Sequence, residues 1–139
     1  MTTTTDELQW ILQKLLQETP GARHALVLAR DGLKLCHSTS LGLDEADHLA
    51  AIASGIQGLV RHASMEFGTG TGSARQAMAE FDGGILLIVE AGEGAHLAVV
   101  AEEDADEGLV GQNMNALVEK IGHHLRASAR EPERPGAAT

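Results

Sequence analysis

The sequence predicts an α+β domain in which helices cover a five-stranded antiparallel sheet, in the order α-β-β-α-β-β-β-α. Three observations support this prediction. Apolar residues repeat at helical spacing in three segments, strand-like apolar segments lie between them, and turn residues such as Asp31-Gly32 separate neighbouring strands. The chain of 139 residues contains no internal repeat or linker, so we expect a single domain over residues 1–127.

The N-terminal part of the chain predicts a helix followed by a hairpin. Thr4 and Glu7 fit a capping box, and apolar residues then repeat at helical spacing, so we expect a helix over residues 5–18. The Asp-Gly turn noted above then joins two expected strands over residues 23–30 and 33–38.

The central segment, Asp44–Phe67, predicts a long helix with Asp44 as its N-cap. Its apolar residues cover more of the circumference than packing on one sheet requires. One face carries Ala46, Leu49, Ala50, Ala53, Ile56 or Gln57, Val60 and Ala63. A neighbouring face carries Ile52, Ile56, Leu59 and Ala63. Such a helix is expected to have packing partners on two sides.

The middle of this helix is slim, because it contains Gly55 and Gly58 among alanines and a serine. Each glycine costs roughly 1 kcal/mol against alanine in a helix interior, but small residues let another backbone approach closely. If the first and last helices share one face of the sheet, the central helix is nearly alone on the other face. We therefore expect a second copy of the same helix as its partner, with a helix sandwiched within one monomer as the alternative.

The C-terminal half predicts three more strands and a last helix. After Gly68–Gly72, strands are expected over residues 74–81, 85–90 and 96–101. The run Ile85–Glu90 is continuously apolar and should be buried on both faces. Asp104 with Glu107 is expected to cap the last helix. Residues 128–139 lack apolar periodicity and contain two prolines, which predicts a disordered tail.

The composition excludes several classes of partner. A net charge of -10 and only 2% aromatic residues disfavour nucleic acid, which requires basic groups for phosphates and aromatic rings for base stacking. The same charge disfavours an anionic membrane surface, and no apolar run is long enough for membrane insertion. Cys36 is the only cysteine, so no intramolecular disulfide forms. Together with an N-terminus unlike a signal peptide, this predicts a cytoplasmic location.

No catalytic or metal-binding pattern is found. The glycine-threonine stretch Gly68–Gly72 leaves a helix and enters a strand without a following lysine, so it predicts a connector and not a phosphate loop. His62 and Glu66 are best explained as a solvated pair, and the serines lack a nucleophile elbow. Cys36 lies in a strand, where a small buried hydrophobe is the usual explanation. We expect a non-enzymatic protein without a cofactor or metal.

The stretches VLARDGL (Val27–Leu33) and GILLIVEAGEGAHLAVVA (Gly84–Ala101), with the long small-residue helix between them, resemble the Roadblock/LC7 family. The resemblance spans Leu8–Leu125 and implies a profilin-like fold. It also implies a homodimer in which the central helices pair and the third strands join the two sheets. The matching positions give an expected dimer interface at Ile52, Ile56, Leu59, Ala63, Ala77 and Ala79.

Bacterial members of that family resemble regulators or scaffolds of small Ras-like GTPases, frequently alongside sensor-kinase-like proteins. The resemblance thus implies a non-enzymatic regulator of such a GTPase in a bacterial signalling system. Arg61 and Arg75 are candidate GTPase contacts, since an arginine finger accelerates hydrolysis roughly 10³- to 10⁵-fold, although a surface role explains each more simply. The alternative function is a small-molecule sensor domain of PAS- or profilin-like type. It predicts a pocket between the central helix and the sheet, lined by a few polar groups.

Overall fold

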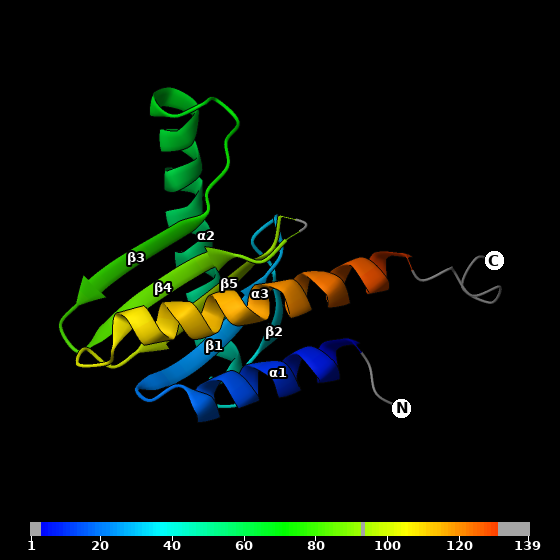
Figure 1. Ribbon diagram of the computed structural model, residues 1–139, viewed down its shortest axis with the longest axis vertical. Helices are drawn as coiled ribbons and strands as arrows, with labels where there is room; N and C mark the ends of the chain where they lie inside the picture. The colour runs from blue at the N-terminus through cyan, green and yellow to red at the C-terminus, as the bar shows by residue number, and fades with distance from the viewer. Residues whose placement is uncertain (1–3, 93, 131–139) are drawn as a thin grey trace.

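The computed structural model describes residues 4–92 and 94–130, and its elements follow the predicted order (Figure 1). The described elements are α1 (Thr4–Glu18), β1 (Ala22–Leu28), β2 (Lys34–His37), α2 (Leu43–Phe67), β3 (Gln76–Phe81), β4 (Gly84–Glu90), β5 (His96–Ala101) and α3 (Glu107–Arg130). The predicted α+β class and element order are therefore confirmed.

The strands form one antiparallel sheet in the order β2-β1-β5-β4-β3. This order places β5 in the centre and leaves β2 and β3 as the two edges. The first six residues of β4 are all buried. Ile85, Leu87 and Val89 pack in the cluster with α1 and α3, whereas Leu86 and Ile88 pack in the cluster with α2. The prediction that this strand is buried on both faces is confirmed.

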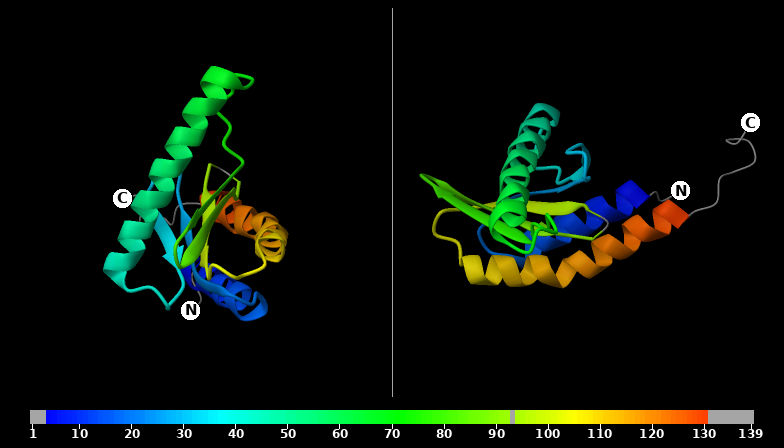
Figure 2. Two further views of the ribbon diagram at one scale, coloured as in Figure 1. Left: turned by 90° about the vertical axis from the view of Figure 1, so that its left-hand side faces the viewer. Right: turned by 90° about the horizontal axis from the view of Figure 1, so that it is seen from above.

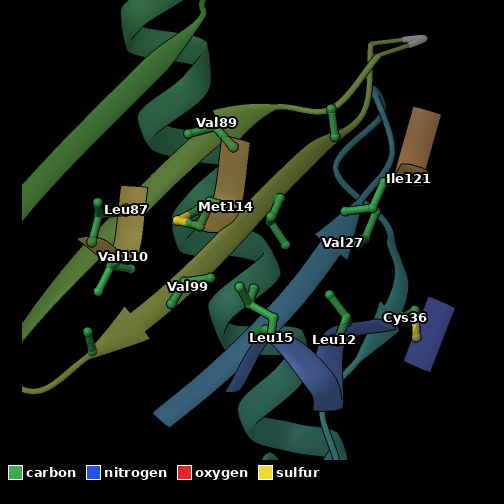
Figure 3. Packing of buried hydrophobic residues seen from close by; sticks show 14 of the residues in the cluster. Leu12, Leu15, Val27, Cys36, Leu87, Val89, Val99, Val110, Met114 and Ile121 are labelled. Carbon is green, nitrogen blue, oxygen red and sulfur yellow. The ribbon is translucent and has the colours of Figure 1, made fainter. Parts of the chain in front are cut away.

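The helices form layers on the two faces of the sheet. Figure 2 shows α1 and α3 side by side on one face and α2 alone on the other. The larger core lies under α1 and α3, where Leu12 and Met114 are fully buried (Figure 3). The expected distribution of helices, with the central helix alone on its face, is therefore confirmed for the described chain.

A five-residue connection, residues 29–33, joins β1 and β2. Gly32 has a φ of 89°, a left-handed conformation that glycine adopts without steric cost. Its N–H donates to Ala29 O at 2.9 Å, and Ala29 N–H donates to Leu33 O at 2.8 Å. The predicted turn is confirmed, but these bonds make the loop longer than expected, so both strands are shorter than predicted.

The N-cap of α2 is Gly42, so the prediction of Asp44 as the cap was wrong. The Glu45 carboxylate Oε1 accepts the Gly42 N–H at 3.0 Å, and the helix begins two residues earlier than predicted. Asp44 and Glu45 both lie in that first turn, where negative charge favours the helix dipole.

The start and end of α3 also differ from the prediction. Asp106, not Asp104, caps the helix, because its Oδ1 accepts the Leu109 N–H at 3.1 Å. A preceding turn, in which Ala105 N–H donates to Glu102 O at 3.0 Å, takes up Asp104. The helix continues through residues 128–130, which were assigned to the tail, since alanine and arginine have high helix propensity. The remaining tail positions, 131–139, lie outside the described residues.

Candidate interaction surface

One side of α2 packs on the sheet. Its buried residues are Ala46, Leu49, Ala50, Ala53 and Gln57. The apolar members of this group form a core cluster with Leu26 and Leu28 of β1 and with Leu86 and Ile88 of β4. The first apolar face predicted from the sequence is thus the sheet-facing side of α2 as far as Gln57. Beyond it the prediction was wrong for Ala63, which is exposed, and Val60 is only partly buried.

The second predicted face forms the α2 stripe, which we define as Ile52, Ile56, Leu59 and Ala63. Ile52 is 53% exposed and Leu59 is 74% exposed. Ile56 is partly buried against the sheet-side cluster, and Ala63 is exposed. Helical spacing therefore places these residues together on a side of α2 that the described part of the chain leaves largely exposed.

Two further large apolar residues near the end of α2 were not singled out from the sequence. Met65 is 58% exposed and Phe67 is 83% exposed. The last turns of the helix project past the sheet, as Figure 1 shows, so no strand lies under them. The sequence contained a signal for these exposed residues. Apolar residues continue along the helix to the glycine-rich connector, so the helix is longer than the sheet under it.

Gly55 and Gly58 face open space. A Cβ atom built on either glycine would meet no heavy atom within 4 Å. Intramolecular packing therefore does not require glycine at these positions, in contrast to Gly32, where a Cβ would lie 2.7 Å from Ser54 Oγ. The two glycines leave the α2 backbone accessible to another chain.

Some side chains of the edge strand β3 point toward the face of the sheet that α2 covers. Ala77 pairs with Ile88 and Ala79 pairs with Leu86, so both methyl groups face the α2 side. Both alanines are partly buried. Within the described chain β3 pairs only with β4, so its other edge carries backbone groups without a strand partner.

The two arginines proposed as GTPase contacts lie in different surroundings. Arg61 lines a cavity beside α2, whereas Arg75 is an exposed residue just before β3 that does not line that cavity. The backbone carbonyl of Arg75 accepts the Glu90 N–H at 2.9 Å, which holds this residue beside the start of the edge strand. The structure therefore does not bring the two guanidinium groups into one site.

The cavity beside α2 has a volume of about 360 Å³. Four segments line it: the end of β1 and its turn, α2, the α2–β3 connector, and the β4–β5 region. Its lining residues are Leu28, Ala29, Arg30, Ser54, Gln57, Arg61, Thr71, Gly72, Ala74, Glu90, Gly94 and His96. A cavity of this kind is what the alternative function of a small-molecule sensor predicts.

Burial shifts the pKa values of His96 in β5 and Cys36 in β2. It lowers the pKa of His96 below the usual 6.5, although a hydrogen bond between Nε2 and Ala74 O, 3.4 Å long, opposes the decrease. It also raises the pKa of the Cys36 thiol to about 11. Cys36 is 4% exposed within the larger core, so its predicted role as a small buried hydrophobe is confirmed.

The described residues contain no group of three or more His, Cys, Asp or Glu side chains placed to hold a metal ion. His62 and Glu66 form an exposed pair with 3.6 Å between Nε2 and Oε2, as predicted. None of the described helices has the length and apolar character needed to cross a membrane. The candidate interaction surface is the apolar surface formed by the α2 stripe and the β3 edge.

Comparison with known proteins agrees with this architecture. The sequence profile of the Roadblock/LC7 domain matches residues 8–101. An uncharacterized protein of Methanocaldococcus jannaschii is 34% identical over 106 residues, which cover 76% of this chain and 90% of that protein. A Roadblock/LC7 domain from Streptomyces avermitilis is 37% identical, with a TM-score of 0.80 over 85% of this chain and 97% of that one.

More distant structures share the fold. Gliding protein MglB of Thermus thermophilus is 24% identical, with a TM-score of 0.76 over 89% of this chain and 92% of its own. Profilin IB of Acanthamoeba castellanii is 17% identical, with a TM-score of 0.55 over 83% of this chain and 96% of its own. The expected profilin-like architecture is therefore confirmed.

Proposed function

Because this chain belongs to the Roadblock/LC7 family, we propose that it is a non-enzymatic, homodimeric regulator or scaffold of a small Ras-like GTPase. It acts in the cytoplasm as part of a bacterial signalling system. The observation that carries this proposal is the exposed α2 stripe beside a sheet edge that lacks a neighbouring strand. Such an apolar surface is typical of a protein interaction site.

The first occupant of this surface is a second copy of the chain. Burying one leucine or isoleucine side chain stabilises a complex by about 1.5–3 kcal/mol, so the exposed Ile52 and Leu59 favour an apolar partner. A two-fold axis brings identical patches together. A single axis of this kind buries the apolar stripe of the helix and gives the edge strand a strand partner. The α2 stripe packs on its own copy, and β3 pairs with β3.

Gly55 and Gly58 support the same partner. Both cost helix stability and neither fills a space within the described chain. An approaching helix backbone uses the room that they leave, so their presence follows from the dimer and not from the monomer. The proposed interface consists of the α2 stripe with Ala77 and Ala79 of the edge strand.

The second partner is the GTPase, and its support comes from the family resemblance. Joining two sheets at β3 creates a continuous surface broad enough for a folded partner protein. Arg61 and Arg75 are the proposed contacts; both are exposed, and Arg75 lies just before the edge strand. A sensor-kinase-like protein is a further partner that the resemblance implies.

Two measurements on one sample test this proposal. Light scattering is expected to give a dimer for the wild type. A pull-down with small Ras-like GTPases from bacteria with Roadblock/LC7 proteins, loaded with GDP or a GTP analogue, is expected to retain at least one of them. A monomer at micromolar concentration would contradict the dimer, and the absence of binding in both nucleotide states would contradict the GTPase partner.

A further inference from the structure

The cavity beside α2 contains a buried polar side chain with no partner. Gln57 is 2% exposed, and neither its amide nitrogen nor its amide oxygen has a hydrogen-bond partner within the described chain. Buried polar groups are nearly always paired, so an orphaned pair of amide atoms calls for an explanation. Gln57 lines the cavity, and a group bound there would supply both a donor and an acceptor.

The cavity also carries an excess of positive charge. Arg30 and Arg61 line it, and Glu90 is the only carboxylate among the lining residues. No ion pair within 4.0 Å involves either arginine among the described residues. The lowered pKa of His96 keeps that ring neutral near pH 7. In a chain with a net charge of -10, this concentration of basic groups favours an anion at this place.

Two glycines in the wall of the cavity allow close contact between the backbone and neighbouring side chains. Gly94 has a φ of 81°, and a Cβ atom at this position would collide with the Arg30 guanidinium. At Gly72 a Cβ would lie 3.3 Å from Met65 Sδ and 3.4 Å from Arg61 Cγ. The guanidinium of Arg30 therefore lies directly against the backbone of the β4–β5 turn, where a side chain would displace it.

We propose that this cavity binds a small organic anion, whose carboxylate or phosphate pairs with Arg30 and Arg61 and whose neutral polar end hydrogen-bonds to the Gln57 amide. The volume of about 360 Å³ corresponds to about twelve liquid water molecules at roughly 30 Å³ each. It therefore accommodates a metabolite of about that number of non-hydrogen atoms and is near the lower end of small-molecule sites. Arginine is the residue best suited to bidentate pairing with either anion.

Anion binding is measured without a GTPase, so the two proposals fail separately even though Arg61 is also a proposed GTPase contact, and the site lies apart from the proposed dimer contact. Arg61 follows Leu59 by two residues, which places them about 160° apart around the helix. Pairing of two copies through the α2 stripe therefore leaves the cavity wall free. Loss of the dimer and loss of anion binding are expected to be separable by mutation.

Matched small molecules test the proposal on the full chain. Glutaramate carries one carboxylate and one amide, glutaramide is its neutral counterpart, and inorganic phosphate is a second anion. We expect glutaramate or phosphate to raise the melting temperature of the wild type by about 5 °C at a tenfold excess over Kd, and glutaramide to have no effect. The side-chain amide signal of Gln57, assigned with Gln57→Leu, is expected to shift in the ¹H–¹⁵N spectrum with glutaramate.

Variants locate the effect. Arg30→Gln and Arg61→Gln are expected to abolish the stabilisation, whereas Arg23→Gln, a surface arginine that does not line the cavity, is expected to keep it. Leu59→Asp is also expected to keep it. The proposal is overturned if neither anion stabilises the wild type, if glutaramide is as effective as glutaramate, or if the two cavity variants respond like the wild type.

Discussion

Ala79 of the edge strand pairs directly with Leu86 of β4, which is 5% exposed under α2. The Ala79 methyl group therefore faces the side of the sheet on which α2 lies. The α2 stripe and the free edge of the sheet belong to one side of the molecule, and a second copy is able to contact both. This relationship underlies the first two predictions.

Replacing Leu59 by Asp is expected to separate the dimer without unfolding the chain. The side chain is 74% exposed, so the monomer should lose no more than about 0.5 kcal/mol of stability. Each copy loses about 1.5–3 kcal/mol of apolar burial at the interface, so the dimer dissociation constant should rise at least about a hundredfold. Sedimentation velocity over a concentration series measures this change.

The matched control is Leu43→Asp, which introduces the same change at a residue that is 70% exposed in the first turn of the same helix. It is expected to remain dimeric. Ile56→Asp should also give monomer or misfolded protein, but that residue is partly buried against the sheet-side cluster, so the two effects are mixed. A Leu59→Asp protein with the wild-type sedimentation coefficient would reject the helix pairing.

Hydrogen exchange tests the joining of the edge strands. The amides of β3 that do not pair with β4 point out of the sheet, and in the dimer they are expected to donate to the partner strand. They should exchange at least about tenfold more slowly in the wild type than in Leu59→Asp. The amides of β2, at the other edge, serve as the control and should exchange equally in both proteins. Equal exchange along β3 would show that the sheets do not join.

Loss of the Arg75 side chain is expected to weaken the GTPase complex. A charge at the rim of an interface contributes modestly, so Arg75→Ala should raise the dissociation constant about two- to fivefold, as measured by titration calorimetry. Arg23→Ala is the control and should bind like the wild type. An unchanged affinity would remove Arg75 from the interface. A fall of about 10³-fold in stimulated hydrolysis would instead assign it as an arginine finger.

The parts of this architecture that periodicity controls were predictable from the sequence. Helical spacing placed Ile52 and Leu59 on one exposed stripe, and the continuous apolar run of β4 indicated burial on both faces. Helix ends were less predictable. Two nearby carboxylates compete for each N-terminus, and only the local backbone decides that Glu45 and Asp106 accept the end amides.

The cavity was not predictable as a specific site, because its walls come from four segments that are distant in sequence. Local patterns carry no information on whether Arg30 and Arg61 approach the same space. One signal was present in the sequence: Gln57 interrupts the otherwise apolar, sheet-facing side of the central helix. A polar residue at a buried helical position is a sign of a partner or a ligand.

Acidification is expected to destabilise the fold through His96. Burial lowers its pKa in the folded chain below the 6.5 of the unfolded chain. The unfolded chain therefore takes up the proton first as pH falls below 6.5, and stability declines until the folded pKa is reached. Urea unfolding between pH 7.5 and 5.5 should show a smaller decline in His96→Gln than in the wild type. His62→Gln, at an exposed position, should follow the wild type.

The Gln57→Leu variant is expected to be more stable than the wild type in the absence of ligand. Leucine has a similar volume, and it removes two buried amide atoms that lack partners, so unfolding should cost about 1–3 kcal/mol more. Gln13→Leu is the matched control. Gln13 makes hydrogen bonds to Thr39 at 3.0 and 3.1 Å, and their loss should lower stability by about 1 kcal/mol. Urea midpoints at constant m-value measure both changes.

A stabilising effect of Gln57→Leu together with a loss of anion binding would show that the polar side chain at this position lowers the stability of the ligand-free protein. Such a conflict between local stability and residue choice is expected at functional sites. Addition of the bound anion should narrow the stability gap, because only the wild type gains the two amide hydrogen bonds. If Gln57→Leu is instead less stable than the wild type without ligand, the amide is already satisfied and the cavity does not require an occupant.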